Sequence, residues 1–130
     1  KADDSLLKAL SDVALPLGEA FQLRDDLLGV YGDPELTGKP AGDDLREGKR
    51  TVLLAHATTL GDADLIYSIL GTEEGAQRLP ELFERWGAVA AVEADISRLV
   101  AQTESAIDVL GERGAALLRP LVSMTIHRNR

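Results

Sequence analysis

The sequence has no cysteine, few aromatic residues and no long apolar run among its 130 residues. Without cysteine the chain can form neither a disulfide nor a thiolate metal site, and its compartment is left open with a preference for the cytoplasm. No apolar stretch approaches the roughly 18 residues that a membrane span requires, and no signal-like start is visible. We therefore expect neither a membrane span nor export.

Basic residues are also scarce, because 14 Lys and Arg stand against 22 Asp and Glu and give a net charge of -8. Neutralising the phosphates of a nucleic acid requires clustered Lys and Arg, so this balance argues against DNA or RNA as a partner. A small anion bridged by metal ions is compatible with it. The proportions of apolar and charged residues are those of an ordinary folded domain.

Sustained alternation of β-branched residues is absent, whereas Leu and Ala recur at helical spacing in nearly every segment. This periodicity predicts an all-α fold. Glycines at helix ends support the boundaries, Pro16 should kink or divide the first helix, and Glu73 and Glu74 suit the dipole of a helix that starts there. The predicted helices cover residues 5–31, 48–60, 63–70, 73–85, 88–110 and 112–127.

The segment GDPELTGKPAGDDLREGK, residues 32–49, is predicted to be a long loop, and ordered loops of this length are commonly functional. Lys39 and Lys49 flank the acidic pair Asp43 and Asp44, so the charges needed to bind a metal-diphosphate complex occur together. The Walker pattern fails because Lys49 is followed by arginine and no strand precedes the loop. The EF-hand pattern fails because acidic residues do not alternate.

The stretch FQLRDDLLGVYGD, residues 21–33, places adjacent carboxylates at Asp25 and Asp26 in an otherwise apolar helix. On a helical projection they share one stripe with Gln22 and Gly29, and the largely apolar remainder predicts a mostly buried helix. Two buried carboxylates repel each other and lose hydration unless a cation compensates. Mg²⁺ suits oxygen ligands without His or Cys, whereas a solvated stripe, or an arginine from another helix, is the alternative.

Residues 21–51, FQLRDDLLGVYGDPELTGKPAGDDLREGKRT, resemble the second aspartate-rich region of the trans-isoprenyl diphosphate synthases. These all-α prenyltransferases make geranyl, farnesyl, geranylgeranyl and longer diphosphates. The resemblance implies that residues 1–130 form the C-terminal half of one isoprenoid synthase helical bundle. The N-terminal half, with the first aspartate-rich motif, would precede this chain.

The same resemblance implies a magnesium site made by three carboxylates. Asp25 would be the principal ligand, Asp26 would belong to the same acidic cluster, and Asp44 would support the metal directly or through water. The third aspartate of the family's DDxxD pattern is replaced by Gly29. This change removes the least essential ligand and does not by itself argue for inactivity.

Four further residues gain roles from the resemblance. Lys39 and Lys49 would hold the leaving diphosphate of an allylic substrate, so that they are predicted to be catalytic together with the aspartate pair. Gln22 would join the hydrogen bonding around the metal and diphosphate. Phe21 would line the site for isopentenyl diphosphate.

The implied activity is that of a polyprenyl diphosphate synthase of geranylgeranyl type, with magnesium-assisted ionisation of the allylic diphosphate before isopentenyl diphosphate attacks. Because the first aspartate-rich motif is missing, we expect residues 1–130 alone to be inactive. They should accompany an N-terminal half or assemble as a homodimer that covers exposed apolar faces. Two alternatives remain, namely a non-catalytic subunit of the same family and an unrelated helical interaction domain.

Overall fold

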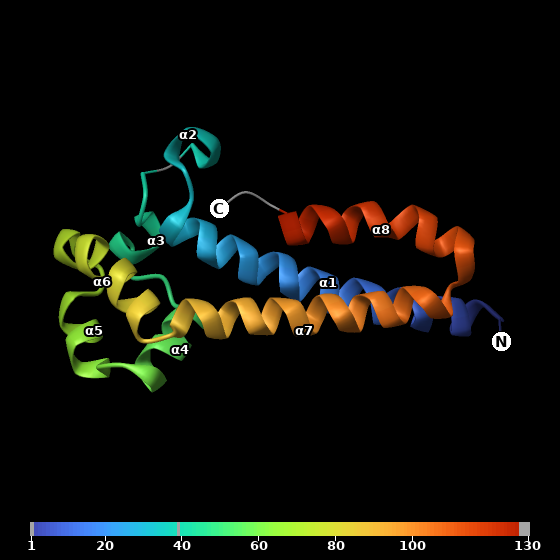
Figure 1. Ribbon diagram of the computed structural model, residues 1–130, viewed down its shortest axis with the longest axis horizontal. Helices are drawn as coiled ribbons and strands as arrows, with labels where there is room; N and C mark the ends of the chain where they lie inside the picture. The colour runs from blue at the N-terminus through green and yellow to red at the C-terminus, as the bar shows by residue number, and fades with distance from the viewer. Residues whose placement is uncertain (1, 39, 128–130) are drawn as a thin grey trace. The chain divides into compact units, whose positions relative to one another are not determined.

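The computed structural model describes residues 2–38 and 40–127, and this part of the chain is helical without a strand. The predicted all-α fold class is therefore confirmed. No helix in the described residues is long and apolar enough to cross a membrane. In chain order the helices are α1 (Ala2–Tyr31), α2 (Pro34–Thr37), α3 (Asp43–Arg46), α4 (Val52–Leu60), α5 (Ala63–Ile69), α6 (Glu73–Arg85), α7 (Ala88–Val109) and α8 (Gly111–His127) (Figure 1).

The helix boundaries agree closely with the predicted ones, with three differences that have physical causes. The helix expected from residue 48 starts at Val52, because the Thr51 side chain accepts a hydrogen bond from the Leu54 N–H at 3.1 Å and caps α4. The loop of residues 32–49 contains the two single-turn helices α2 and α3. Helix α1 runs through Pro16, which does not divide it, since a proline removes only one bond of a 30-residue helix.

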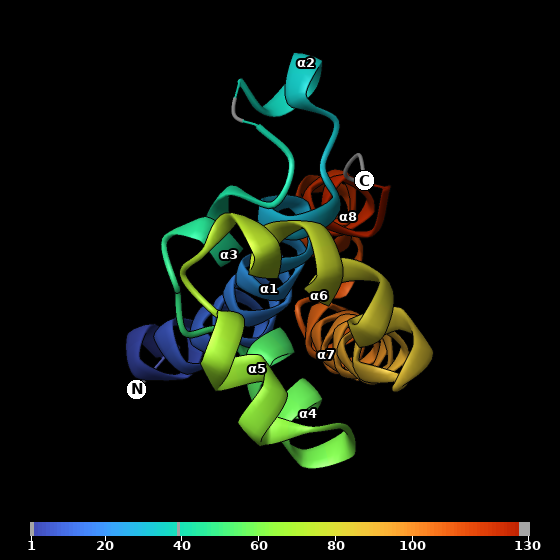
Figure 2. The same ribbon diagram turned by 90° about the vertical axis from the view of Figure 1, so that its left-hand side faces the viewer.

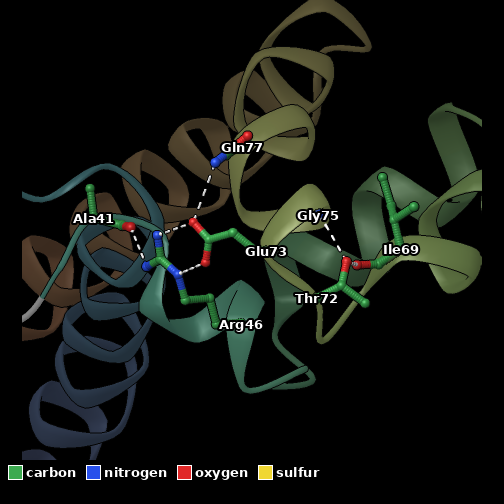
Figure 3. Close-up of polar contacts among 7 residues, drawn as sticks. All are labelled: Ala41, Arg46, Ile69, Thr72, Glu73, Gly75 and Gln77. Atoms are coloured by element: carbon green, nitrogen blue, oxygen red, sulfur yellow. Dashed lines mark hydrogen bonds and ion pairs between the residues drawn. The ribbon is translucent and has the colours of Figure 1, made fainter.

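Glycines mark the helix ends that the sequence predicts. Gly61 is the C-cap residue of α4, and Gly71 lies directly before Thr72, the N-cap residue of α6. The Thr72 hydroxyl accepts from the Gly75 N–H at 3.1 Å and donates to the Ile69 carbonyl (Figure 3). This cap fixes the turn between α5 and α6.

The described residues form two compact units. Unit 1 comprises residues 2–24 and 95–127, in which α8 folds back along the C-terminal part of α7 (Figure 1). Its part of α1 buries Val13 and Ala20 but exposes Leu7 and Leu15. The prediction that this helix is mostly buried is therefore wrong for its first half, where most residues are exposed.

Unit 2 comprises residues 25–38 and 40–94 and contains the predicted loop. Within it α3 contacts α6, α6 contacts α5, and α5 contacts α4 (Figure 2). The Tyr31 hydroxyl, at the end of α1, donates to the Pro80 carbonyl in α6 at 2.6 Å. Burial, followed by the negative charge of Glu84, raises the pKa of Tyr31, so its hydroxyl stays protonated and able to donate near neutral pH. The buried apolar side chains of unit 2 are Leu27, Val30, Leu45, Leu53, Leu54, Ala57, Ile66, Ile69, Ala76, Leu79, Phe83, Ala88 and Val92.

Helix α3 is anchored to α6 by an ion pair between Arg46 and Glu73 (Figure 3). The Arg46 guanidinium donates to both carboxylate oxygens, at 2.6 and 3.0 Å, and also to the Ala41 carbonyl at 2.8 Å. Next to it Leu45 is buried, and its carbonyl accepts from the Gly71 N–H at 2.9 Å. A helix of four residues, too short to be stable alone, is thereby fixed in place.

The ion pair between Arg46 and Glu73 should make stability depend on pH. The hydrogen bond and charge of Arg46 lower the pKa of Glu73 in the folded chain. Such a carboxylate stabilises the fold above its unfolded pKa, and the contribution is lost as pH falls through the folded pKa. Glu73→Gln should therefore lower the unfolding temperature near neutral pH and flatten its decline as the pH falls below the ordinary pKa of a glutamate, measured by circular dichroism.

Glu74→Gln is the matched control. Glu74 pairs with Arg78 at 2.6 Å within α6 itself, so its replacement should change the unfolding temperature less. Identical pH profiles for Glu73→Gln and the unmodified chain would show that the pair contributes nothing to stability.

Candidate functional site

The paired aspartates lie on the last turns of α1, in the helical register that the sequence predicts. Asp26 is buried, with 4% of its surface exposed, whereas Asp25 is partly exposed. Gly29 follows Asp25 by four residues and Asp26 by three, so its Cα lies on the same stripe one turn further along. Because Gly29 has no side chain, the stripe is open at that turn.

Asp44 of α3 fills this opening. A Cβ built on Gly29 would lie 1.9 Å from Asp44 Oδ2, 2.4 Å from Cγ and 2.9 Å from Oδ1. The Asp44 carboxylate therefore rests directly on the Gly29 backbone, and only 6% of Asp44 is exposed. A loop carboxylate is thus placed against α1 one turn beyond Asp25 and Asp26.

Lys49 contacts Asp44 through both its backbone and its side chain. Its backbone N–H donates to the Asp44 carbonyl at 2.9 Å, and its ammonium lies 3.7 Å from Asp44 Oδ2. Nearly half of the Lys49 side chain is exposed. The ammonium can therefore compensate the Asp44 carboxylate while remaining accessible to an anion.

Four of the seven residues predicted for the site, Asp25, Asp26, Asp44 and Lys49, lie in unit 2. Of these, Asp44 and Lys49 are in contact, and Asp44 lies against Gly29, one turn beyond the aspartate pair. Phe21 and Gln22 lie on the preceding turn of α1, in unit 1, and both are exposed. Lys39 lies outside the described residues.

The donor chemistry of this group fits magnesium better than a metal that needs a closed protein cage. Within residues 2–38 and 40–127, no three Asp, Glu, His or Cys side chains are close enough to hold a metal ion by themselves. Magnesium commonly takes one or two carboxylates and completes its shell with waters and substrate phosphates. Carboxylates such as Asp25 and Asp44 are therefore the kind of protein ligand that such a shell would use.

Two features of the site had no local signal in the sequence. Arg46 fixes α3 by bonding to Glu73, 27 residues away, and Glu73 was expected only to suit a helix dipole. The close contact of Asp44 with Gly29 joins residues 15 positions apart across a loop. Neither pairing follows from helical periodicity, which reports only neighbours within one helix.

Comparison with known proteins finds the Polyprenyl synthetase family model over residues 1–85. The chain is 37% identical over 112 residues to a geranylfarnesyl diphosphate synthase of Aeropyrum pernix, covering 84% of this chain and 34% of that protein. It is 31% identical over 139 residues to a geranylgeranyl diphosphate synthase of Saccharolobus solfataricus, covering 100% and 42% respectively. The chain thus spans well under half the length of these relatives.

The chain is also similar to a solved structure. The geranylgeranyl pyrophosphate synthase of Corynebacterium glutamicum, crystallised with isoprenyl diphosphate and magnesium, matches with a TM-score of 0.86 and 41% identity. The match covers 95% of this chain and 38% of that protein. The described residues of the present chain have the all-α isoprenoid synthase fold. The chain belongs to the polyprenyl synthetase family.

Proposed function

We propose that residues 1–130 are the C-terminal half of a prenyl diphosphate synthase that condenses isopentenyl diphosphate with an allylic diphosphate. The observation that carries the proposal is the contact of Asp44 with Gly29, one turn beyond Asp25 and Asp26 on α1, with the Lys49 ammonium 3.7 Å from Asp44. Carboxylates for magnesium and a cation for diphosphate are what the leaving group of this reaction requires.

The reaction begins with heterolytic cleavage of the allylic C–O bond, and the electron pair leaves with the diphosphate. Lys49, together with Lys39, would contact the diphosphate oxygens, where negative charge accumulates, and thereby stabilise the transition state. Asp25, Asp26 and Asp44 would hold Mg²⁺, which when bound supplies further positive charge at the leaving group. The double bond of isopentenyl diphosphate then forms the new C–C bond, and loss of a proton restores a double bond.

Phe21 and Gln22 are both exposed on α1. Phe21 is proposed to line the isopentenyl diphosphate site, and Gln22 is proposed to join the hydrogen bonding around the metal and the allylic diphosphate. Product length stays open, since relatives are named for products from geranylgeranyl to octaprenyl diphosphate. A homodimer and a cytoplasmic location remain predictions. The family match removes the unrelated interaction domain as an alternative, and the presence of Asp25, Asp44 and Lys49 in the sequence favours an enzyme over a non-catalytic subunit.

An assay of prenyl transfer tests the proposal. The full-length protein that carries this chain should incorporate labelled isopentenyl diphosphate into a longer allylic diphosphate, and removal of Mg²⁺ by a chelator should abolish the reaction. Residues 1–130 alone should give no turnover. A full-length protein without transfer to any allylic diphosphate from C5 to C20 would contradict the enzyme and favour a non-catalytic subunit.

Asp25→Ala should reduce turnover of the full-length protein much more than Asp26→Ala. Asp25 is the proposed principal ligand and is partly exposed, whereas Asp26 is a further member of the same acidic cluster and is buried, so its replacement should affect stability more than turnover. Losing a direct stabiliser of the leaving group should lower kcat by roughly 100-fold or more. Steady-state kinetics and thermal unfolding of both variants distinguish these effects, and near-normal turnover in both would refute the assignment.

Lys39→Ala and Lys49→Ala should weaken binding or ionisation of the allylic diphosphate and leave the helical content unchanged. A hydrogen bond to a charged group contributes about 1.5–3 kcal/mol, equivalent to roughly 10- to 150-fold in kcat/KM. Lys8→Ala is the control, because it removes an equal charge from an exposed pair with Asp12 in unit 1. Unfolding of either loop variant, seen by circular dichroism, would instead make that lysine structural.

A further inference from the structure

Lys49 is the last residue of the predicted loop, and contacts on both sides of it lead to the same pair of helices. These helices, α5 and α6, form with the turn that joins them the α5–α6 hairpin, residues 63–85. The hairpin is well packed, because the side chains of Ile66, Leu79 and Phe83 are fully buried. It therefore offers a firm base to the loop residues that contact it.

Two polar contacts hold the chain before Lys49. The Gly71 N–H, in the turn of the hairpin, donates to the Leu45 carbonyl at 2.9 Å. The Arg46 guanidinium donates to both carboxylate oxygens of Glu73, at 2.6 and 3.0 Å (Figure 3). A guanidinium that binds a carboxylate through two bonds fixes orientation as well as distance. The backbone is thus held at the third and fourth residues before the lysine.

The hairpin also contacts the two residues directly next to Lys49. A Cβ built on Gly48 would lie 3.7 Å from the Gly71 Cα, so the two glycine backbones lie next to each other. On the other side, the Arg50 guanidinium lies over the Tyr67 ring, 5.5 Å from its centroid, within the range of a cation–π contact. Lys49 thus stands between two residues that touch the same hairpin.

We propose that Glu73 and Tyr67 of the hairpin are positioning residues, which hold Lys49 where its ammonium can contact the leaving diphosphate. Glu73 acts through the guanidinium of Arg46. Tyr67 acts through the guanidinium of Arg50. This inference rests on the proposed function, since that function assigns the diphosphate to Lys49. Neither hairpin residue needs to touch the substrate, because a lysine acts as a point charge whose effect depends on where its backbone places it.

A double-mutant cycle in the full-length protein tests the inference, with Glu73→Ala, Lys49→Ala and both changes together. Glu73→Ala should lower kcat/KM for the allylic diphosphate by roughly 10-fold, because misplacing a catalytic group by about 1 Å can cost about 100-fold. If Glu73 acts through Lys49, the double variant should be no less active than Lys49→Ala. A loss of stability alone would instead lower activity by the same factor in both backgrounds.

Glu74→Ala is the matched control, because Glu74 pairs with Arg78 within α6 itself, and its kcat/KM should be unchanged. Tyr67→Leu removes the ring beneath Arg50 and should lower kcat/KM by about 2- to 5-fold. Tyr67→Phe keeps the ring and should be normal. Because Tyr67 is 51% exposed, neither replacement opens the core, and this pair tests the inference even if Glu73→Ala does not fold.

Amide hydrogen exchange of the full-length protein, without metal or substrate, gives a reading that does not depend on activity. The Lys49 N–H donates to the Asp44 carbonyl at 2.9 Å, so release of this segment should expose it to solvent. Exchange in the peptide that contains Lys49 should therefore be faster in Glu73→Ala and unchanged in Glu74→Ala.

Unchanged kcat/KM in both Glu73→Ala and Tyr67→Leu would overturn the inference and leave the proposed function standing. Equal losses with and without Lys49, or unchanged exchange in Glu73→Ala, would do the same. A full-length protein that transfers no prenyl group, but whose exchange at Lys49 responds to Glu73→Ala, would overturn the proposed function, and the hairpin would still be what holds this lysine.

Discussion

The arrangement of the site depends on one close contact, that of the Asp44 carboxylate with the backbone of Gly29. It attaches a four-residue helix in a long loop to the last turns of α1, where Asp25 and Asp26 lie. A helix as short as α3 has no stability of its own. Its place is therefore set by tertiary contacts: Asp44 against α1, the buried side chain of Leu45, and Arg46 bound to Glu73.

Burying a carboxylate costs free energy, and for Asp44 a neighbouring lysine compensates this cost. Asp26 and Asp44 are 4% and 6% exposed, and a buried charge is tolerated when an opposite charge or hydrogen bonds compensate it. Lys49 provides such a charge for Asp44, and half of its side chain remains exposed. In the proposed site, a diphosphate would thus find the Lys49 ammonium beside it, and the metal ions would find the Asp44 carboxylate.

Helical periodicity was sufficient to predict the six longer helices, because each has an apolar repeat and end signals such as Gly61 and Thr72. It also placed Asp25, Asp26 and Gly29 on one stripe. It could not predict α3, whose position comes from Arg46 and Glu73, residues that are distant in the chain. Nor could it predict exposure of Leu15, because the sequence does not show which sides of α1 are covered.

The central claim is that Asp44 and the aspartate pair of α1 share one magnesium-diphosphate site. The most direct measurement is a crystal structure of the full-length protein with Mn²⁺ in place of Mg²⁺ and with pyrophosphate, using anomalous scattering to locate the metal. We predict a metal peak in contact with Asp25, with Asp44 bound to it directly or through one water, and pyrophosphate oxygens near the Lys49 ammonium. Metal and pyrophosphate bound elsewhere, with the Asp44 carboxylate still resting on Gly29 and neither aspartate engaged, would contradict the account.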